Sequence, residues 1–276
     1  RFGGRARIGR TAGRTDRSFR KQREFCALAL DRPIIARSER DIGKLLIGAT
    51  IEPRFAAAPD SEIKRRGFGI AARHQRIVWT GDNQATWTDL QWSLTMTLSL
   101  GLSGQPFAGP DVGGFDGDPT PELFVRWFEL GCWLPFFRGH SSKSACRKEP
   151  WAFGAEVEGV LRKILARRMR FLPVWSTLMA EAAETGVPPA RPVFFADPTD
   201  RELRAIDDAF LVGTDLLVAP VVTAEQRKRT IRLPQGSWYR LPLDGAIDEQ
   251  LEAIQGQVEV DAAWGATPVF VRAGTV

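Results

Sequence analysis

The stretch Ile77-Val78-Trp79-Thr80-Gly81-Asp82-Asn83 decides the fold. Its three apolar residues predict a short strand, and the polar residues that follow predict a loop directly after it. Apolar residues then recur at helical spacing, which predicts a helix over residues 88–100. The order strand, loop, helix is the repeating unit of an α/β domain with a parallel sheet.

The same order continues along the chain. Further strands are predicted at residues 106–108, 135–137 and 191–195, and further helices at residues 120–133 and 153–185. Thr120 before Pro121 is a typical helix start, and Pro173 is expected to bend or break the last helix. Four strands are too few to close an eight-stranded barrel, so the predicted fold is the second half of a (β/α)8 TIM barrel.

After residue 198 the pattern changes to short strand-like runs separated by turn residues. Such runs lie at residues 216–218, 230–233 and 267–271. They predict an antiparallel β-sandwich domain. The predicted domains are a basic leader of unassigned fold at residues 1–64, the partial barrel at residues 65–197 and the β-sandwich at residues 198–276.

Positive charge is concentrated at the start of the chain. Residues 1–73 hold 18 Lys and Arg residues against 8 Asp and Glu residues, whereas residues 74–276 hold 20 against 25. A basic arm can bind nucleic acid by releasing counterions. Here the arginines are irregularly spaced with almost no aromatic residues between them, which favours a solvated leader. We therefore predict no nucleic-acid partner.

The composition also excludes several kinds of site. The three cysteines are scattered, without the paired spacing of a disulfide framework or a metal site, and His74 and His140 are the only histidines. The apolar run at residues 209–222 is interrupted and too short to span a bilayer. We predict no cofactor, no metal and no membrane partner. The compartment stays open, with the cytoplasm favoured by the cysteine pattern.

Ordered motifs continue from the first loop far into the last predicted domain. They are Trp79-Thr80-Gly81-Asp82-Asn83 with Trp87, Gly101-Leu102-Ser103-Gly104, Asp111-Val112-Gly113-Gly114-Phe115, Arg126-Trp127, Pro135-Phe136-Phe137-Arg138-Gly139-His140-Ser141, Glu149-Pro150-Trp151 and Leu216-Leu217-Val218-Ala219-Pro220-Val221. This series resembles glycoside hydrolase family 31, the α-glucosidase and α-xylosidase group. The resemblance implies that a terminal α-linked glucose or a related sugar is cleaved with retention of configuration.

The resemblance implies that Asp82 is the acid/base, which protonates the leaving oxygen and then activates water. We expect its carboxyl group to be buried near a negative partner; the alternative is a loop Asp in an Asx-turn. Asp111 would accept hydrogen bonds from sugar hydroxyls, or else serve only a turn. Arg138 and His140 would donate to sugar hydroxyls, with a structural role as the alternative for the histidine.

Trp79 and Phe115 are implied as aromatic walls of the sugar subsite, and core packing explains Phe115 equally well. Arg65 is implied as a further substrate-binding residue, with Arg66 as the alternative in the same alignment. Glu149 belongs to a matching motif without an assigned chemical role.

The family's nucleophile is an aspartate in a Trp-x-Asp-Met-Asn-Glu-like segment upstream of the acid/base loop. No such segment precedes Asp82 here, and all three methionines follow it. We therefore expect a retaining α-glycoside hydrolase that acts on an oligosaccharide or α-glycoside but lacks its nucleophile in this chain. Its expected partner is the missing amino-terminal half of the barrel. The alternative is a catalytically inactive sugar-binding or interaction fragment. The chain starts at Arg1, and we expect the true amino terminus to lie elsewhere.

Overall fold

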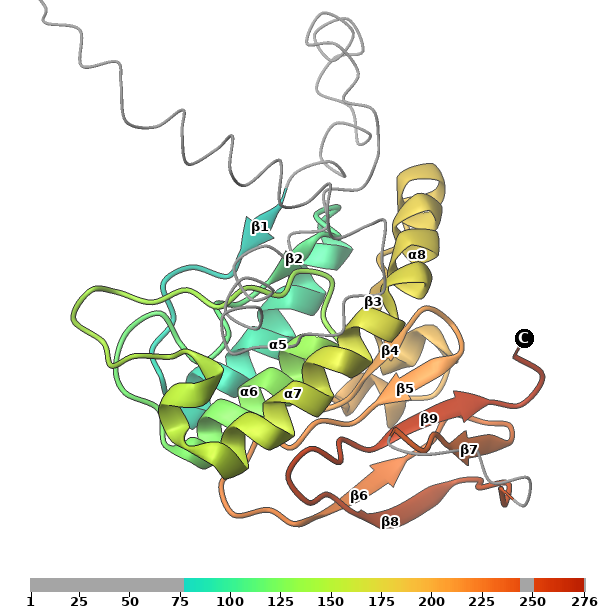
Figure 1. Ribbon diagram of the computed structural model, residues 1–276. Helices are drawn as coiled ribbons and strands as arrows, with labels where there is room; N and C mark the ends of the chain where they lie inside the picture. The colour runs from blue at the N-terminus through green and yellow to red at the C-terminus, as the bar shows by residue number, and fades with distance from the viewer. Residues whose placement is uncertain (1–76, 244–250, 276) are drawn as a thin grey trace, which may run out of the picture. The chain divides into compact units, whose positions relative to one another are not determined.

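The first described elements alternate between strand and helix. The structure is a computed structural model that describes residues 77–243 and 251–275, all within the unit Thr50–Val276. Strand β1 (Val78–Trp79), helix α5 (Trp87–Leu102) and strand β2 (Ala108–Gly109) follow one another. β1 and β2 pair in parallel, so α5 is their crossover helix (Figure 1). The predicted strand, loop and helix order is confirmed for this part of the chain.

The third predicted strand is reduced to a short parallel contact. Residues 135–137 form no strand; instead Asp111 and Arg138 form an isolated parallel bridge. The N–H group of Val112 donates to the carbonyl of Arg138 at 2.8 Å. Pro135 has no N–H group to contribute to a ladder, which limits the pairing here.

Helix α6 (Pro121–Cys132) has the predicted start. The Thr120 hydroxyl accepts a hydrogen bond from the N–H group of Leu123 at 3.3 Å. Pro121 lies in the first turn, where a missing N–H group costs nothing, and Glu122 lies at the positive end of the helix dipole. Residues 123–132 are all buried, so α6 contacts its neighbours on every side.

The single helical region predicted over residues 153–185 is two helices, α7 (Ala155–Arg170) and α8 (Leu172–Thr185). The break lies at Phe171, because Pro173 is accommodated in the first turn of α8. Gly186 ends α8 in the left-handed conformation with φ of 78°. The predicted break and the predicted helix end are both confirmed.

The prediction of a fourth parallel strand at residues 191–195 was wrong. Strand β3 (Ala190–Pro192) pairs antiparallel with β4 (Phe210–Val212), and Val193–Phe195 form a 3-10 helix. A run of three to five residues indicates a strand without indicating its partner or direction, and Pro192 cannot extend a ladder as a donor. The predicted boundary between residues 197 and 198 stays a prediction.

The rest of the chain forms antiparallel sheets. A five-stranded sheet has the order β3-β4-β5-β9-β7, and β6 and β8 form a two-stranded sheet (Figure 1). A shared hydrophobic core contains residues of both sheets, among them Leu217, Phe270, Ile231 and Trp238. The chain is thus a TIM-barrel fragment followed by an antiparallel sheet domain. The bounds are β5 Leu216–Val218, β6 Lys228–Arg232, β7 Trp238–Arg240, β8 Gln257–Asp261 and β9 Val269–Arg272.

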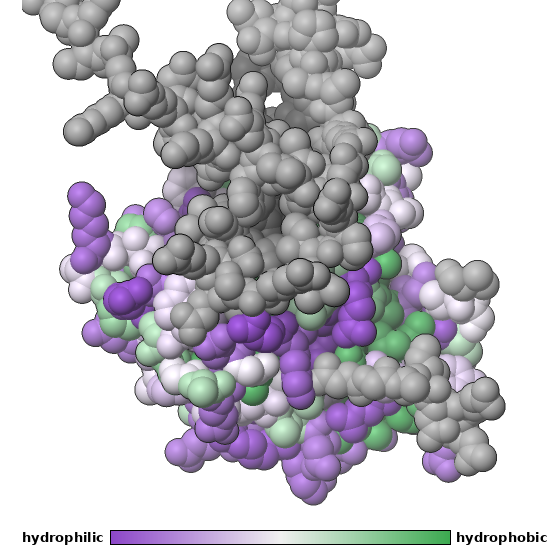
Figure 2. Space-filling view, in the orientation of Figure 1, coloured by the Kyte–Doolittle hydropathy of each residue, from purple (hydrophilic) through white to green (hydrophobic). Residues whose placement is uncertain are grey.

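The surface of the described residues is mixed in polarity. Hydrophilic and hydrophobic residues are interspersed on the face that Figure 2 shows. Large apolar side chains are exposed on and beside α5, namely Ile77, Trp79, Trp92, Met96 and Leu102.

Among the described helices none is long and apolar enough to cross a membrane. Within residues 77–243 and 251–275, no three His, Cys, Asp or Glu side chains gather to hold a metal ion.

Candidate active site

Three loops meet at the carboxyl ends of β1, β2 and the segment 135–138. Gln84 bridges to Asp116, and Asp111 bridges to Arg138, both in parallel register. Because neighbouring parallel strands end at one edge, the loops that follow them lie side by side. Residues that are distant in the sequence are therefore brought to one edge of the fragment.

Asn83 connects the loop after β1 with the loop after β2. Its Nδ2 donates to the carbonyl of Asp111 at 3.2 Å, and its Oδ1 accepts from the N–H group of Phe115 at 3.0 Å. Its own carbonyl accepts from the N–H group of Asp116 at 3.1 Å. Sequence reasoning missed this role. The signal in the sequence was the side-chain amide of Asn83, directly after Asp82, because an amide can both donate and accept hydrogen bonds.

Asp111 is fully buried and is held by Arg138. The guanidinium donates to Oδ1 of Asp111 from Nε at 2.7 Å and from Nη2 at 2.5 Å. The Asp111 side chain is 0 % exposed, whereas that of Arg138 is 32 % exposed. The second oxygen, Oδ2, is buried and accepts no hydrogen bond from the described residues. An unsatisfied buried acceptor is costly, and Oδ2 keeps the capacity to accept a further hydrogen bond.

Burial raises the pKa of the Asp111 carboxyl above its ordinary value of 3.8 and is the largest contribution. The hydrogen bond and positive charge of Arg138 act in the opposite direction, as does His140. The negative charge of Asp82 adds to the rise. Asp111 therefore responds electrostatically to three other residues of the predicted site.

Asp82 is exposed, which contradicts the expectation that its carboxyl group is buried. The backbone before it is fixed by the hydrogen bond from the N–H group of Thr80 to the carbonyl of Gly109, at 3.2 Å. Behind it, Asn83 is only 8 % exposed and makes the contacts with the loop after β2. The loop is thus anchored through the neighbours of Asp82, while Asp82 itself is exposed.

Aromatic side chains flank the same edge. The guanidinium of Arg138 lies 5.7 Å from the centre of the Trp79 ring, and Trp79 is 49 % exposed. The rings of Phe115 and His140 lie 5.3 Å apart with 37° between their planes. Phe115 is half-buried and His140 is exposed, so neither is a core residue. A flat, partly exposed aromatic surface of this kind suits the C–H faces of a sugar ring.

The loop after β2 is joined to the loop after residue 138 by polar contacts that sequence reasoning also missed. The Ser142 hydroxyl donates to Oδ1 of Asp116 at 2.8 Å, and this bond is the largest cause of a lowered pKa for that carboxyl. The N–H group of Ser142 donates to the carbonyl of Phe115 at 2.7 Å. Nζ of Lys148 donates to the carbonyl of Gly114 at 2.7 Å. These bonds hold the two loops together before any ligand is present.

Gly114 is required where the loop after β2 passes the loop after β1. Its φ is 81°, and a Cβ atom there would lie 2.7 Å from backbone atoms of Ala85. Only glycine combines this conformation with this close approach.

Arg65 and Arg66 lie outside the described residues, so a role for either stays a prediction.

A hollow of about 660 Å³ lies beside the loop after β1, between Trp79 and the exposed face of α5. It is lined by neither Asp82 nor Asp111.

Two family models match consecutive parts of this chain. The glycosyl hydrolases family 31 TIM-barrel domain matches residues 56–178, and the glycosyl hydrolase family 31 C-terminal domain matches residues 186–276. The chain belongs to glycosyl hydrolase family 31. Membership in family 31 agrees with the fold, since a barrel fragment precedes an antiparallel sheet domain.

Family 31 relatives are similar over about three quarters of the chain. Alpha-glucosidase 2 of Bacillus thermoamyloliquefaciens is 41 % identical over 213 residues, which are 77 % of this chain and 26 % of the relative. Neutral alpha-glucosidase AB of Homo sapiens is 38 % identical over 213 residues, 76 % of this chain and 22 % of that protein. The chain thus spans about a quarter of the length of these relatives.

Solved structures of family 31 enzymes have the same fold. The catalytic subunit of ER glucosidase II, solved with the binding domain of its regulatory subunit, matches with a TM-score of 0.68 and 35 % identity, covering 74 % of this chain and 22 % of that one. An alpha-xylosidase from a soil metagenome, solved with xylose, matches with a TM-score of 0.65 and 32 % identity, covering 72 % of this chain and 32 % of that one.

Proposed function

We propose that this chain carries the acid/base part of a retaining α-glycoside hydrolase that acts on terminal α-linked glucose or a related sugar. The observation that carries the proposal is the buried Asp111 carboxylate. One of its oxygens is held by Arg138 and the other is free to accept a hydrogen bond. A fixed acceptor of this kind orients a sugar hydroxyl at modest entropic cost. The relatives named as α-glucosidases and an α-xylosidase support the same substrate class.

In this proposal Asp82 protonates the leaving oxygen and then removes a proton from water. Its exposed position leaves the carboxyl group accessible to a glycosidic oxygen. Asp111 accepts from sugar hydroxyls, and Arg138 and His140 donate to them.

The sugar ring would lie between aromatic faces. Trp79 and Phe115 are partly exposed at this edge and supply those faces. Arg65, or Arg66 in the alternative alignment, would add a further donor to the sugar.

The nucleophile has to come from elsewhere in this proposal. A retaining mechanism needs a second carboxyl group roughly 5–5.5 Å from the acid/base. Oδ1 of Asp111 accepts two hydrogen bonds from Arg138, and in this proposal the carboxylate serves binding instead. The family's nucleophile motif does not occur in this sequence. The partner would then be the amino-terminal half of the barrel. The exposed apolar residues on α5 are a surface that such a partner would cover.

A second candidate function is a catalytically inactive sugar-binding or interaction fragment. The exposure of Asp82 favours it, because an acid/base of a retaining enzyme is expected to be buried near a negative partner. Both candidates use the same sugar contacts and differ only in turnover.

Hydrolysis of an aryl α-glucoside tests the proposal, with the chain alone and with the amino-terminal half-barrel added. We expect Asp82→Asn to lower turnover by roughly 10²- to 10⁴-fold, the usual contribution of general acid–base catalysis. Its affinity for glucose should change little, because Asp82 acts on the glycosidic oxygen. Isothermal titration with glucose measures that affinity.

Asp111→Asn should instead weaken glucose binding, because an amide replaces the charged acceptor. Asp118→Asn is the matched control. Asp118 follows the same strand and accepts from the N–H group of Cys146 at 2.7 Å, outside the proposed sugar contacts. Glucose binding without turnover under both conditions would favour the inactive fragment. Neither binding nor turnover would overturn the proposal and also the sugar-binding form of the second candidate.

A further inference from the structure

The pair Arg126 and Glu129 on α6 is buried. Arg126 is 0 % exposed and Glu129 is 1 % exposed, and their Nη1 and Oε2 atoms lie 2.9 Å apart. The proposed sugar contacts use neither residue. A buried ion pair is expensive unless further hydrogen bonds satisfy both groups. Both residues make such bonds outside their own helix.

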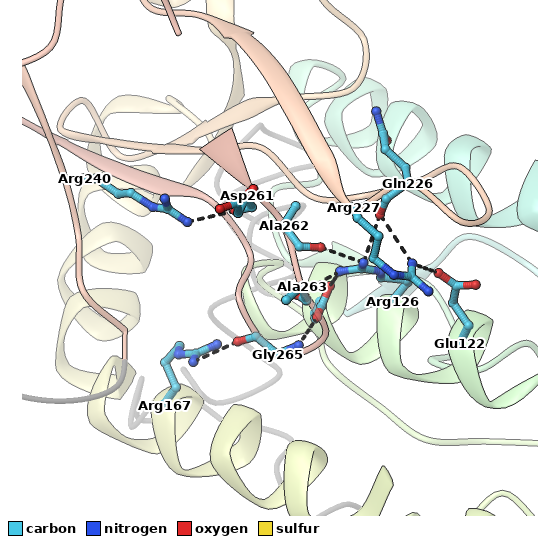
Figure 3. A network of polar contacts seen from close by, with 11 residues as sticks. Glu122, Arg126, Arg167, Gln226, Arg227, Arg240, Asp261, Ala262, Ala263 and Gly265 are labelled. Atoms are coloured by element: carbon cyan, nitrogen blue, oxygen red, sulfur yellow. Dashed lines mark hydrogen bonds and ion pairs between the residues drawn. The ribbon is translucent and has the colours of Figure 1, made fainter. Parts of the chain in front are cut away.

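Both charges bind backbone atoms of the turn at residues 262–265 of the sheet domain, and Figure 3 shows Arg126 with Ala262 and Ala263. Arg126 donates from Nη2 to the carbonyl of Ala262 at 2.7 Å and from Nη1 to that of Ala263 at 3.2 Å. Glu129 accepts from the N–H group of Gly265. All of these partners are backbone atoms, which cannot change rotamer to relieve a shift. The turn and the helix are therefore held in one register.

Two neighbouring contacts strengthen the same attachment. Arg126 also donates from Nη2 to the carbonyl of Gln226 at 3.1 Å. Arg167 of α7 donates from Nη2 to the carbonyl of Gly265 at 3.2 Å (Figure 3). The turn therefore forms hydrogen bonds with two helices of the barrel fragment, α6 and α7.

The opposite face of α6 packs on the two segments that carry Asp111 and Arg138. A Cβ atom added at Gly131 would lie 2.8 Å from the ring of Phe137 and 2.8 Å from Cγ2 of Val112. Val112 directly follows Asp111 and Phe137 directly precedes Arg138. The helix is therefore at the limit of close packing against Val112 and Phe137, so a displacement of α6 reaches the chain neighbours of both Asp111 and Arg138.

We infer that Arg126 and Glu129 are a positioning pair: by fixing α6 to the 262–265 turn, they set the placement of Asp111 against Arg138. The sheet domain is then part of the sugar site's support, although none of its residues is a proposed sugar contact. As far as sugar binding is concerned, the inference rests on the proposed function. Neither residue is a catalytic residue, because both act through α6.

The test compares two variants of the 276-residue chain with a control. Glu129→Gln replaces one carboxylate oxygen with an NH2 group, so the side chain can no longer accept from both Arg126 and Gly265, and Arg126 loses its counter-charge. The double variant Arg126→Met with Glu129→Leu removes both charges, so it keeps the fold testable if the single variant does not fold. Glu122→Gln is the control on the same helix. Its partner Arg227 is 49 % exposed at the rim of the same interface.

The first readout does not depend on sugar. The N–H group of Val112 donates to the carbonyl of Arg138, so its hydrogen exchange reports on the pairing of the two site segments. We expect exchange at Val112 to rise by roughly tenfold or more in folded samples of both variants and to stay at the wild-type rate in Glu122→Gln. Wild-type exchange at Val112 in both folded variants would overturn the inference.

The second readout is the affinity for glucose. We expect it to fall roughly 10- to 100-fold in both variants, since displacements of about 1 Å at a site have effects of that size. Unchanged affinity in the folded variants would overturn the inference while leaving the proposed function intact. A wild-type chain that does not bind glucose would count against the proposed function, and exchange at Val112 would still decide the inference.

Discussion

At the scale of single residues, Arg138 favours the ionised form of the buried Asp111 carboxyl group, which is the stronger hydrogen-bond acceptor. Burial alone raises the pKa of Asp111, which would favour a neutral acid with a weaker acceptor oxygen. The hydrogen bonds and charge of Arg138 oppose that rise. The same guanidinium stands over the Trp79 ring, so one residue links the polar contact to the aromatic face.

Arg138→Met should raise the pKa of Asp111 further, because both lowering contributions of Arg138 are lost. A folded-state pKa above the unfolded value means that ionisation costs stability. This cost is absent at low pH and grows as pH rises from about 3.8 through the folded pKa. The stability deficit of the variant should therefore be larger at neutral pH than near pH 4. Denaturant unfolding at several pH values measures the deficit, and carbon NMR of the carboxyl measures its titration.

Arg138→Lys is the matched control for that prediction. It keeps the positive charge but not the planar fork, so we expect a smaller rise in the pKa of Asp111. An Asp111 pKa in Arg138→Met that stays at the wild-type value or falls would contradict the prediction.

At the scale of elements, a glycine and a buried arginine fix the loops and the helix end next to the site. The glycine is Gly114 and the arginine is Arg168. Gly114 lets the loop after β2 pass against Ala85. Arg168 of α7 donates to the carbonyls of Cys132, Leu134 and Pro135, at 2.8, 2.5 and 2.9 Å. A cation at the carboxyl end of α6 is favourable for the helix dipole. It also fixes the segment that leads to Arg138.

Gly114→Ala should destabilise the fold more than Gly104→Ala. The two glycines have nearly equal φ, 81° and 79°, so both variants carry a similar backbone cost. A Cβ atom at Gly104 meets nothing within 4 Å, whereas one at Gly114 meets the backbone of Ala85 at 2.7 Å. We expect a difference of about 1–3 kcal/mol in the free energy of unfolding, the usual cost of overpacking. Equal losses by denaturant titration would refute the clash.

Arg168→Met should cost roughly 3 kcal/mol or more in unfolding free energy, because three buried carbonyls lose a charged donor. Arg170→Met is the control, since Arg170 is exposed and, among the described residues, donates one hydrogen bond, to the carbonyl of Leu243. Its effect should stay within about 0.5 kcal/mol. Chemical denaturation of both variants side by side provides the comparison, and similar losses would argue against a structural role for Arg168.

At the scale of the whole molecule, the barrel fragment and the sheet domain share buried charges at their contact. Arg126, Glu129 and Arg167 are each at most 1 % exposed, and all bond to the 262–265 turn. Separation of the two parts would leave these groups without the bonds that offset their desolvation. The two parts therefore depend on one another for stability.

We expect the barrel fragment and the sheet domain to unfold in a single transition. Hydrogen exchange under increasing denaturant measures this, with the buried amides of α6 and of β9 as reporters of the two parts. Their opening free energies should converge on one value. Two separated values, with β9 intact after α6 has opened, would contradict a shared transition.

Local features could be predicted from the sequence because their causes lie within a few residues of one another. The helix start at Thr120, the helix break before Pro173 and the strand at Ile77-Val78-Trp79 all follow from neighbouring residue types. The order of the motifs was sufficient to recognise family 31, which two family models then showed.

Tertiary structure alone decided the features that depend on distant residues. It paired β3 with β4 rather than with the barrel, joined Asn83 to the loop that carries Asp111, and left Asp82 exposed while burying Asp111. Partner choice, register and burial are set by the packing of segments that the chain brings together only on folding. The sequence by itself therefore determined the helices, the first strand and the family, and the packing of the elements decided which carboxylate is buried against Arg138 and which is exposed.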